Sequence, residues 1–150
     1  MMRILMVCLG NICRSPLAEG ILSHKTKNLQ VQVDSAGTAG YHIGSPPDPR
    51  SIKIADKYNI DLSSQRARKF SRADFNNFDI IYAMDSNNYK NLLALTINQQ
   101  EKEKIRMILN EISPNLYKSV PDPYYGGNDG FQEVYDILNK ACDKIVTQIG

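Results

Sequence analysis

Short apolar runs alternate with amphipathic segments along the chain, and this alternation constrains the fold more than any other feature. A series of strand-helix-strand units requires a largely parallel sheet with right-handed crossovers and helices on both faces. Ligands then bind beyond the carboxyl ends of the strands. In chain order the pattern predicts a strand over 3–7, a helix over about 16–27, a strand over 31–34, a helix over about 49–58, a strand over 79–84, a helix over about 86–98, a strand over about 105–109 and a helix over about 130–148.

Length and composition are typical of one soluble globular domain. A chain of 150 residues buries roughly 70% of the surface that its unfolded form exposes. The residues are 42% hydrophobic and 23% charged, which is the usual balance for such a protein. No repeat or long linker divides the chain, so we expect a single domain over 1–150. No apolar run approaches the ~20 residues that cross a bilayer, so we expect no membrane insertion.

Charge and cysteine content exclude several classes of partner. The formal net charge is +2, and the basic residues are dispersed, so we expect no nucleic-acid partner. Cys8, Cys13 and Cys142 are an odd number, and no secretory segment precedes the first strand, which favours a cytoplasmic protein over one exported by another route. His24 and His42 have no metal-ligand partner at suitable spacing, and no nucleotide-binding motif occurs, so no metal or cofactor is expected.

The loop over 8–15 reads Cys-Leu-Gly-Asn-Ile-Cys-Arg-Ser and lies between the first strand and the first helix. Backbone N–H groups at a helix N-terminus bind an oxyanion, and the same field favours a thiolate at Cys8. Arg14 offers a planar guanidinium for two phosphate oxygens. Phosphoryl transfer through a covalent intermediate needs such a nucleophile and such a cation. The loop is therefore predicted to hold phosphate and attack it, although a lone cysteine at a strand end is usually an inert core residue.

The other residues of this loop fit the same function. Gly10 lets the backbone approach an anion closely, and Asn11 tolerates a left-handed conformation. Ser15 either caps the helix or donates a hydrogen bond to the sulfur as it leaves a phosphocysteine. Two more loops, over 37–49 and 120–130, are rich in glycine and proline and have the placement of functional loops in α/β sheets.

The loop with its flanks, residues 7–16, resembles the signature of the low-molecular-weight protein tyrosine phosphatases. The resemblance implies a flavodoxin-like three-layer α/β fold, with a central four-stranded parallel sheet and helices on both faces. It also implies metal-free hydrolysis through a phosphocysteine intermediate. Further matching blocks follow in the expected order, at 34–37, 47–50, 67–68, 78–81, 83–85 and 122–126.

By position, the resemblance implies a role for three residues. Cys8 would be the nucleophile, Arg14 the ligand of the phosphate and of the transition state, and Asp122 the general acid that protonates the leaving phenolate. Asp122 would then accept a proton from water in the second step. Only the resemblance and the proline-flanked loop indicate Asp122, because an Asp-Pro turn is otherwise usually structural.

The same resemblance assigns the walls and supports of the site. A phosphotyrosine ring would stack between Tyr41, Tyr124 and Tyr125, although tyrosines at loop tips also serve as amphipathic cover. Asp85 matches an aspartate that orients Arg14 or its loop, and it would otherwise be a helix cap. Gln65 stands where many relatives have a histidine of the loop network, and it does not titrate near neutrality. The predicted substrate-binding residues of the loop itself are Leu9, Gly10, Asn11, Ile12, Cys13 and Ser15.

Cys13 indicates redox regulation, because it lies in the same tight loop as Cys8. Peroxide would convert the Cys8 thiolate into a sulfenic acid, which Cys13 would resolve as a disulfide. The alternative is that Cys13 is a small residue tucked under the loop. Cys142 lies in the last predicted helix and is most simply a core residue.

Particular residues distinguish phosphotyrosine hydrolysis from three rival functions. A thiol-dependent arsenate reductase needs two relay cysteines near the third strand, where residues 82–84 and 87–89 hold none. Protein-arginine phosphatases tend to carry Thr where Ile12 stands. A non-catalytic phosphopeptide-binding module would lose Cys8 or Asp122, and both are present. We therefore expect an enzyme, monomeric or weakly self-associating, whose substrate is a phosphotyrosine protein or a small aryl phosphate.

Overall fold

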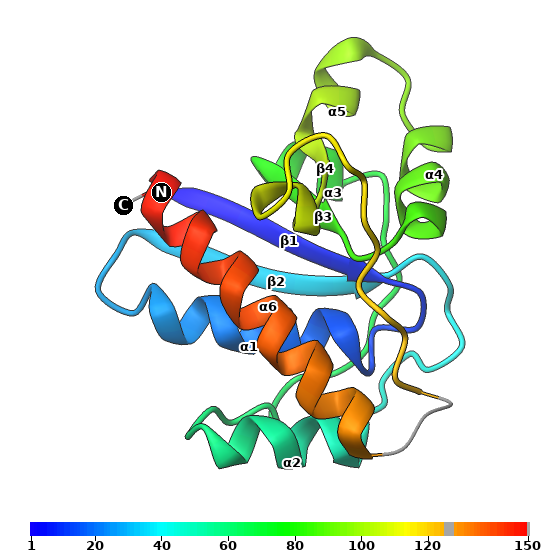
Figure 1. Ribbon diagram of the computed structural model, residues 1–150. Helices are drawn as coiled ribbons and strands as arrows, with labels where there is room; N and C mark the ends of the chain where they lie inside the picture. The colour runs from blue at the N-terminus through cyan, green and yellow to red at the C-terminus, as the bar shows by residue number, and fades with distance from the viewer. Residues whose placement is uncertain (125–127, 150) are drawn as a thin grey trace.

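The computed structural model describes residues 1–124 and 128–149, and it contains a four-stranded sheet in the order β2-β1-β3-β4. All neighbouring strands run parallel. Figure 1 shows β1 running through the middle of the molecule beside β2. The predicted parallel sheet is confirmed. The strands are β1 (Met2–Cys8), β2 (Val31–Gly37), β3 (Ile80–Ala83) and β4 (Ile105–Met107).

The helices follow the predicted order, with two differences in the middle of the chain. The predicted helix over 86–98 ends at Ala94, with Leu95 as its C-cap, and an unpredicted helix follows at Gln99–Lys104 after the extended Asn98. The Asn98 side chain accepts a hydrogen bond from the Glu101 N–H and so begins a new helix. A single turn, α3, was not predicted. The helices are α1 (Arg14–Lys25), α2 (Pro49–Lys57), α3 (Asp74–Asn77), α4 (Ser86–Ala94), α5 (Gln99–Lys104), the 3-10 turn η1 (Ile108–Glu111) and α6 (Asn128–Ile149).

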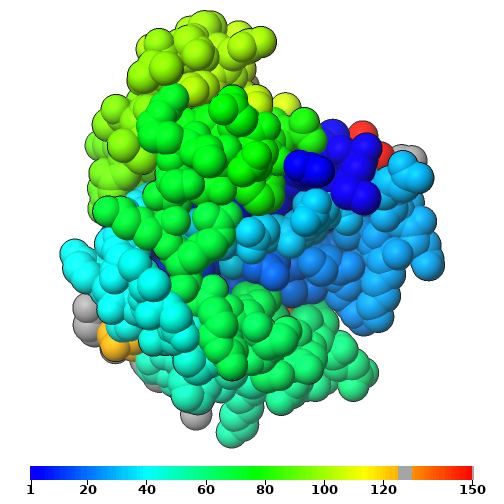
Figure 2. Space-filling model, turned by 180° about the vertical axis from the view of Figure 1, so that it is seen from behind, coloured from blue at the N-terminus to red at the C-terminus, as the bar shows by residue number. Residues whose placement is uncertain are grey.

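Alternate side chains of β1 enter two different cores, as the two-residue period of a strand requires. Ile4, Met6 and Cys8 belong to the core under α1 and α6, whereas Leu5 and Val7 belong to the core on the other face. Figure 1 shows α1 and α6 against the front of the sheet with α2 below these two helices, and Figure 2 shows the back covered by the segment that links α2 to β3. The predicted three-layer arrangement is therefore confirmed. None of the helices in the described part of the chain is long and apolar enough to cross a membrane.

The carboxyl end of β1 is enclosed by its neighbours, and this positions the loop that follows it. Cys8 lies opposite Gly37 in the register with β2, and Val7 lies opposite Ala83 in the register with β3. The β2 side holds the loop through the main chain, because the Ala39 N–H donates to the Leu9 carbonyl at 2.9 Å. Gly37 is required there, since a Cβ at this position would lie 2.7 Å from the Leu9 oxygen and 3.2 Å from the Asn11 nitrogen.

Gly37→Ala is expected to destabilise the protein by about 1–3 kcal/mol, because the added methyl meets rigid backbone and must displace the loop. Urea unfolding measures the change. The matched control is Gly130→Ala, where the Cβ would make an ordinary contact of 3.6 Å with Pro123. Equal stability of the two variants would contradict this account of the packing between β2 and the loop.

Candidate active site

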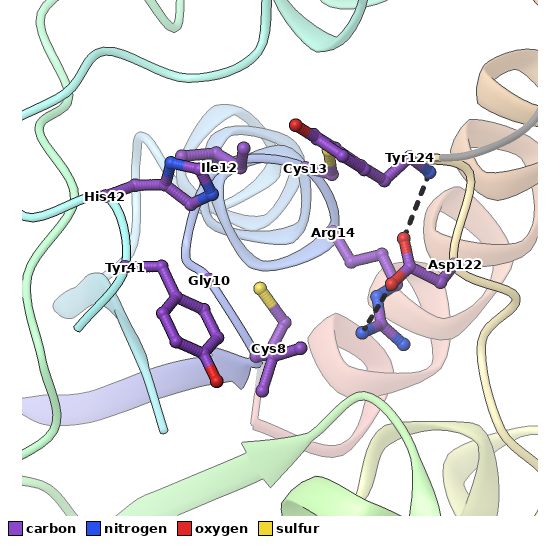
Figure 3. Close-up of a pocket in the computed structure, with 10 residues that line it drawn as sticks. Cys8, Gly10, Ile12, Cys13, Arg14, Tyr41, His42, Asp122 and Tyr124 are labelled. Carbon is purple, nitrogen blue, oxygen red and sulfur yellow. Dashed lines mark hydrogen bonds and ion pairs between the residues drawn. The ribbon is translucent and has the colours of Figure 1, made fainter. Parts of the chain in front are cut away.

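The loop after β1 surrounds the Cys8 sulfur with hydrogen-bond donors. Cys8 is only 3% exposed, and its side chain points into a cavity of about 330 Å³ (Figure 3). The Asn11 N–H donates to its sulfur at 3.3 Å, and the Ser15 hydroxyl lies 2.9 Å from it. The helix begins at Arg14 rather than at 16, and its N-cap makes no side-chain hydrogen bond. Of the two roles predicted for Ser15, the structure therefore places it against the sulfur.

Asn11 holds the loop in shape from behind. Its backbone has a φ of 58°, the left-handed conformation that the sequence predicts. Its side-chain amide donates to the Ser15 Oγ at 2.9 Å and to the Ser35 Oγ at 3.0 Å. Its side-chain oxygen accepts from the Arg68 N–H at 3.0 Å. Asn11 therefore uses both ends of its side chain to fix the turn.

Arg14 is 3% exposed, and its guanidinium is held by groups from other parts of the chain. Its Nη1 donates to the Asp85 carboxylate at 2.7 Å and to the Val120 carbonyl at 3.1 Å. A buried guanidinium must be paired in this way, because an unpaired buried charge is very costly. Asp85 also accepts from the Asn88 N–H at 2.7 Å, so the same carboxylate both caps α4 and orients Arg14.

The segment after Val120 brings Asp122 to the same cavity. Its carboxylate lies 3.6 Å from the Arg14 Nη2 and accepts from the Tyr124 N–H at 3.0 Å. The Asp122 side chain is 40% exposed, so it reaches both the arginine and solvent. Figure 3 shows Cys8, Arg14 and Asp122 turned toward one space.

Aromatic side chains from two loops form the walls of this cavity. Tyr41 and Tyr124 both line it, and in Figure 3 they lie on opposite sides of the Cys8 sulfur. His42 lines it too, with its ring 6.5 Å from that of Tyr124. Sequence pattern alone assigns His42 no role beyond a possible metal ligand, although its place beside Tyr41 is a usable signal. Tyr125 lies outside the described residues.

The remaining loop residues divide between the cavity and the packing behind it. Leu9, Gly10, Ile12 and Cys13 line the cavity. Asn11 and Ser15 are buried behind it and act through the contacts described above. The structure therefore brings the predicted loop residues together, some at the surface of the site and some as its support.

Cys13 is backed by an ion pair that sequence reasoning missed, although both residues lie in a block of the resemblance. Arg50 donates to the Asp48 carboxylate at 3.0 Å, and also to the Tyr124 carbonyl at 3.0 Å. Burial raises the pKa of Cys13 to about 12, and the Asp48 charge adds to this. All three cysteines are free thiols. The disulfide between Cys8 and Cys13 stays a prediction.

Gln65 supports the first turn of α1 and makes no hydrogen bond to Asn11 or Ser15 among the described contacts. Its amide donates to the Pro16 carbonyl at 3.1 Å, and its own oxygen is buried with no partner in the described part of the chain. Across residues 1–124 and 128–149, no group of three or more metal-ligating side chains comes together.

Fold and site together define a phosphatase with an oxyanion-binding loop that carries a cysteine and an arginine. A sequence model of the family described as "Low molecular weight phosphotyrosine protein phosphatase" matches residues 3–150. The chain belongs to this family, which confirms the resemblance.

Two solved structures and a relative found by sequence match most or nearly all of this chain. A protein tyrosine phosphatase of Entamoeba histolytica, crystallised with Hepes in its active site, is 40% identical and superposes with a TM-score of 0.92, covering 99% of this chain and 97% of its own. YfkJ of Bacillus subtilis is 37% identical with a TM-score of 0.91, covering 99% and 94%. A low molecular weight phosphotyrosine protein phosphatase of Schizosaccharomyces pombe is 41% identical over 89% of this chain and 87% of its own.

Iodoacetamide at neutral pH is expected to alkylate Cys8 well before Cys13 and Cys142. Burial raises the pKa of each of the latter two to about 12, so both stay protonated and unreactive. Peptide mapping by mass spectrometry measures the order of labelling, and inorganic phosphate should slow the labelling of Cys8 by occupying the loop. Labelling of Cys13 first would contradict this picture of the site.

Proposed function

We propose that this chain hydrolyses phosphotyrosine, in proteins or as small aryl phosphates, through a phosphocysteine intermediate on Cys8. The observation that carries the proposal is the convergence of the Cys8 sulfur, the Arg14 guanidinium and the Asp122 carboxyl group on one cavity. These three groups supply a nucleophile, a phosphate ligand and a proton donor. Membership of the phosphotyrosine phosphatase family supports the same conclusion.

In the first step the Cys8 sulfur attacks phosphorus, and an S–P bond forms as the P–O bond to the phenol breaks. Arg14 binds oxygens of the phosphoryl group and stabilises the charge that they carry in the transition state. The neutral Asp122 carboxyl group donates its proton to the departing phenolate oxygen. The phenol leaves past the walls formed by Tyr41 and Tyr124.

In the second step water attacks the phosphocysteine and inorganic phosphate leaves. Asp122, now a carboxylate, accepts the proton of the attacking water and is ready for the next cycle. The S–P bond breaks and returns the electron pair to the Cys8 sulfur. Ser15 lies 2.9 Å from that sulfur, and it is placed to donate a hydrogen bond to the leaving thiolate.

The walls of the cavity support an aryl ester as the preferred substrate. Tyr41 and Tyr124 offer aromatic faces on either side of the nucleophile, and an aromatic leaving group stacks well between such faces. Arsenate reduction by a thiol relay lacks support here. The remaining cysteine outside the loop, Cys142, is fully buried in the core between α6 and α1.

Asp122→Asn should slow the hydrolysis of an aryl phosphate with a poor leaving group by about 10²-fold or more, because general acid catalysis typically contributes this much. A good leaving group such as p-nitrophenolate needs little protonation, so its release in the first step should be much less affected. Stopped-flow release of the two phenols measures the difference.

Asp56→Asn serves as the control for that experiment, because Asp56 is exposed on α2. It should behave as the wild type with both substrates. Equal slowing of good and poor leaving groups by Asp122→Asn would contradict the general-acid assignment. Phosphoarginine and arsenate are assayed alongside, and faster turnover of either than of phosphotyrosine would overturn the proposed substrate.

A further inference from the structure

A chain of hydrogen bonds runs from the Cys8 sulfur to Glu19, a carboxylate that the reaction above does not use. The Ser15 hydroxyl lies 2.9 Å from the sulfur, and it accepts from the Asn11 amide at 2.9 Å. The same amide donates to the Ser35 hydroxyl at 3.0 Å. Ser35 in turn donates to the Glu19 Oε1 at 2.6 Å. The Cys8 sulfur and the Glu19 carboxylate are thus the two ends of one series of hydrogen bonds.

The direction of every hydrogen bond in this chain follows from the chemistry of Asn11. Its side-chain nitrogen is a donor with two hydrogens, so both serine hydroxyls accept from it. Each serine hydroxyl proton therefore points away from Asn11 and is available for a second partner. The Ser15 proton points to the Cys8 sulfur, and the Ser35 proton points to the Glu19 carboxylate, which only accepts when it is ionised.

We propose that Glu19 is a positioning residue for Cys8, whose ionised form holds Ser35 and Asn11 in the arrangement that leaves Ser15 donating to the sulfur. The proposal rests on the proposed function, because its effect is on that reaction. Protonation turns the charge-assisted hydrogen bond between Ser35 and Glu19 into a weaker neutral one. A proton on Oε1 would also point at the Ser35 oxygen and leave the Ser35 proton without its acceptor. Asn11 is then held less firmly.

The surroundings of Glu19 place the protonation of its carboxylate in the neutral pH range. Burial raises the pKa of Glu19 to about 7; the Ser35 hydrogen bond and the Arg68 charge lower it, and the Asp34 charge raises it. Arg68 is itself paired with Asp34 and Asp74. No ion pair to Glu19 occurs among the described residues.

The other titratable groups beside Glu19 lie around one cavity. The cavity beside Glu19 is lined by His24, Lys27 and Asp61 among the titratable groups, and by the neutral Gln65. Gln65 is directed to the Pro16 carbonyl instead. Gln65 adds no charge beside Glu19, whose pKa is raised to about 7 chiefly by burial.

The test compares kcat and kcat/KM for phenyl phosphate in the wild type and in Glu19→Gln, from about pH 5.5 to about pH 8.5. The ratio of wild-type to variant kcat should rise about fivefold as the pH rises through 7, because a charge-assisted hydrogen bond is replaced by a neutral one only in the variant. Glu103→Gln, at an exposed position of α5, should give a constant ratio of one.

Ser35→Ala tests the path of the effect, because it breaks the chain and leaves Glu19 in place. Its pH profile should parallel that of Glu19→Gln. A constant ratio of wild type to Glu19→Gln across the pH range would overturn the proposal and show that Glu19 is merely structural. A retained inflection in Ser35→Ala would overturn the path through Ser35. Absence of wild-type turnover would overturn the proposed function instead.

Thermal unfolding tests the ionisation of Glu19 independently of activity. The folded protein holds the Glu19 proton more tightly than the unfolded chain, whose carboxyl has a pKa of about 4.5. Wild-type stability is therefore lost as the pH rises from about 4.5 to about 7, and the loss is absent in Glu19→Gln. The Tm of Glu19→Gln minus the Tm of the wild type should therefore be larger at pH 8 than at pH 5. The same difference in Tm at pH 5 and at pH 8 would contradict the proposal.

Discussion

The buried ion pair between Arg14 and Asp85 is the interaction on which the rest of the site depends. An arginine that is 3% exposed at the first turn of α1 is tolerated because the turn after β3 supplies a carboxylate at 2.7 Å. The Val120 carbonyl accepts from the same nitrogen, and Val120 itself donates to the Met84 carbonyl. The pair therefore joins the loop after β1, the turn after β3 and the segment that carries Asp122.

The central position of β1 in the sheet explains why its loop is so well enclosed. Parallel neighbours on both sides end at the same edge, so the segments after β2 and β3 lie beside Cys8. The end of β2 contributes Gly37, the segment after it contributes Tyr41 and Asp48, and the turn after β3 contributes Asp85. Packing, register and site geometry thus follow from one strand order. The hydrogen-bond chain from Cys8 to Glu19 adds a layer of support inside this frame, between α1 and β2.

Local pattern was enough to predict the parallel sheet, the loop over 8–15, and Cys8 and Arg14 within it, because these features depend on neighbours in the chain. Asp122 came only from the resemblance and the proline-flanked loop, since its contact with Arg14 joins distant segments. The break between α4 and α5 depends on one extended residue, Asn98. Likewise, the support of the loop by Ser35 and Glu19 depends on β2 lying against α1. Such long-range contacts leave no periodic signal in the sequence.

The central claim is that phosphate passes through the Cys8 sulfur, and the most direct test is to trap it there. Asp122→Asn is mixed with p-nitrophenyl phosphate, quenched in acid within milliseconds and mapped by mass spectrometry. The account predicts a phosphoryl group on Cys8, because this variant still forms the intermediate from a good leaving group but lacks the base for its hydrolysis. Cys8→Ser should trap none and turn over none. Phosphate on another residue, or turnover by Cys8→Ser, would contradict the account.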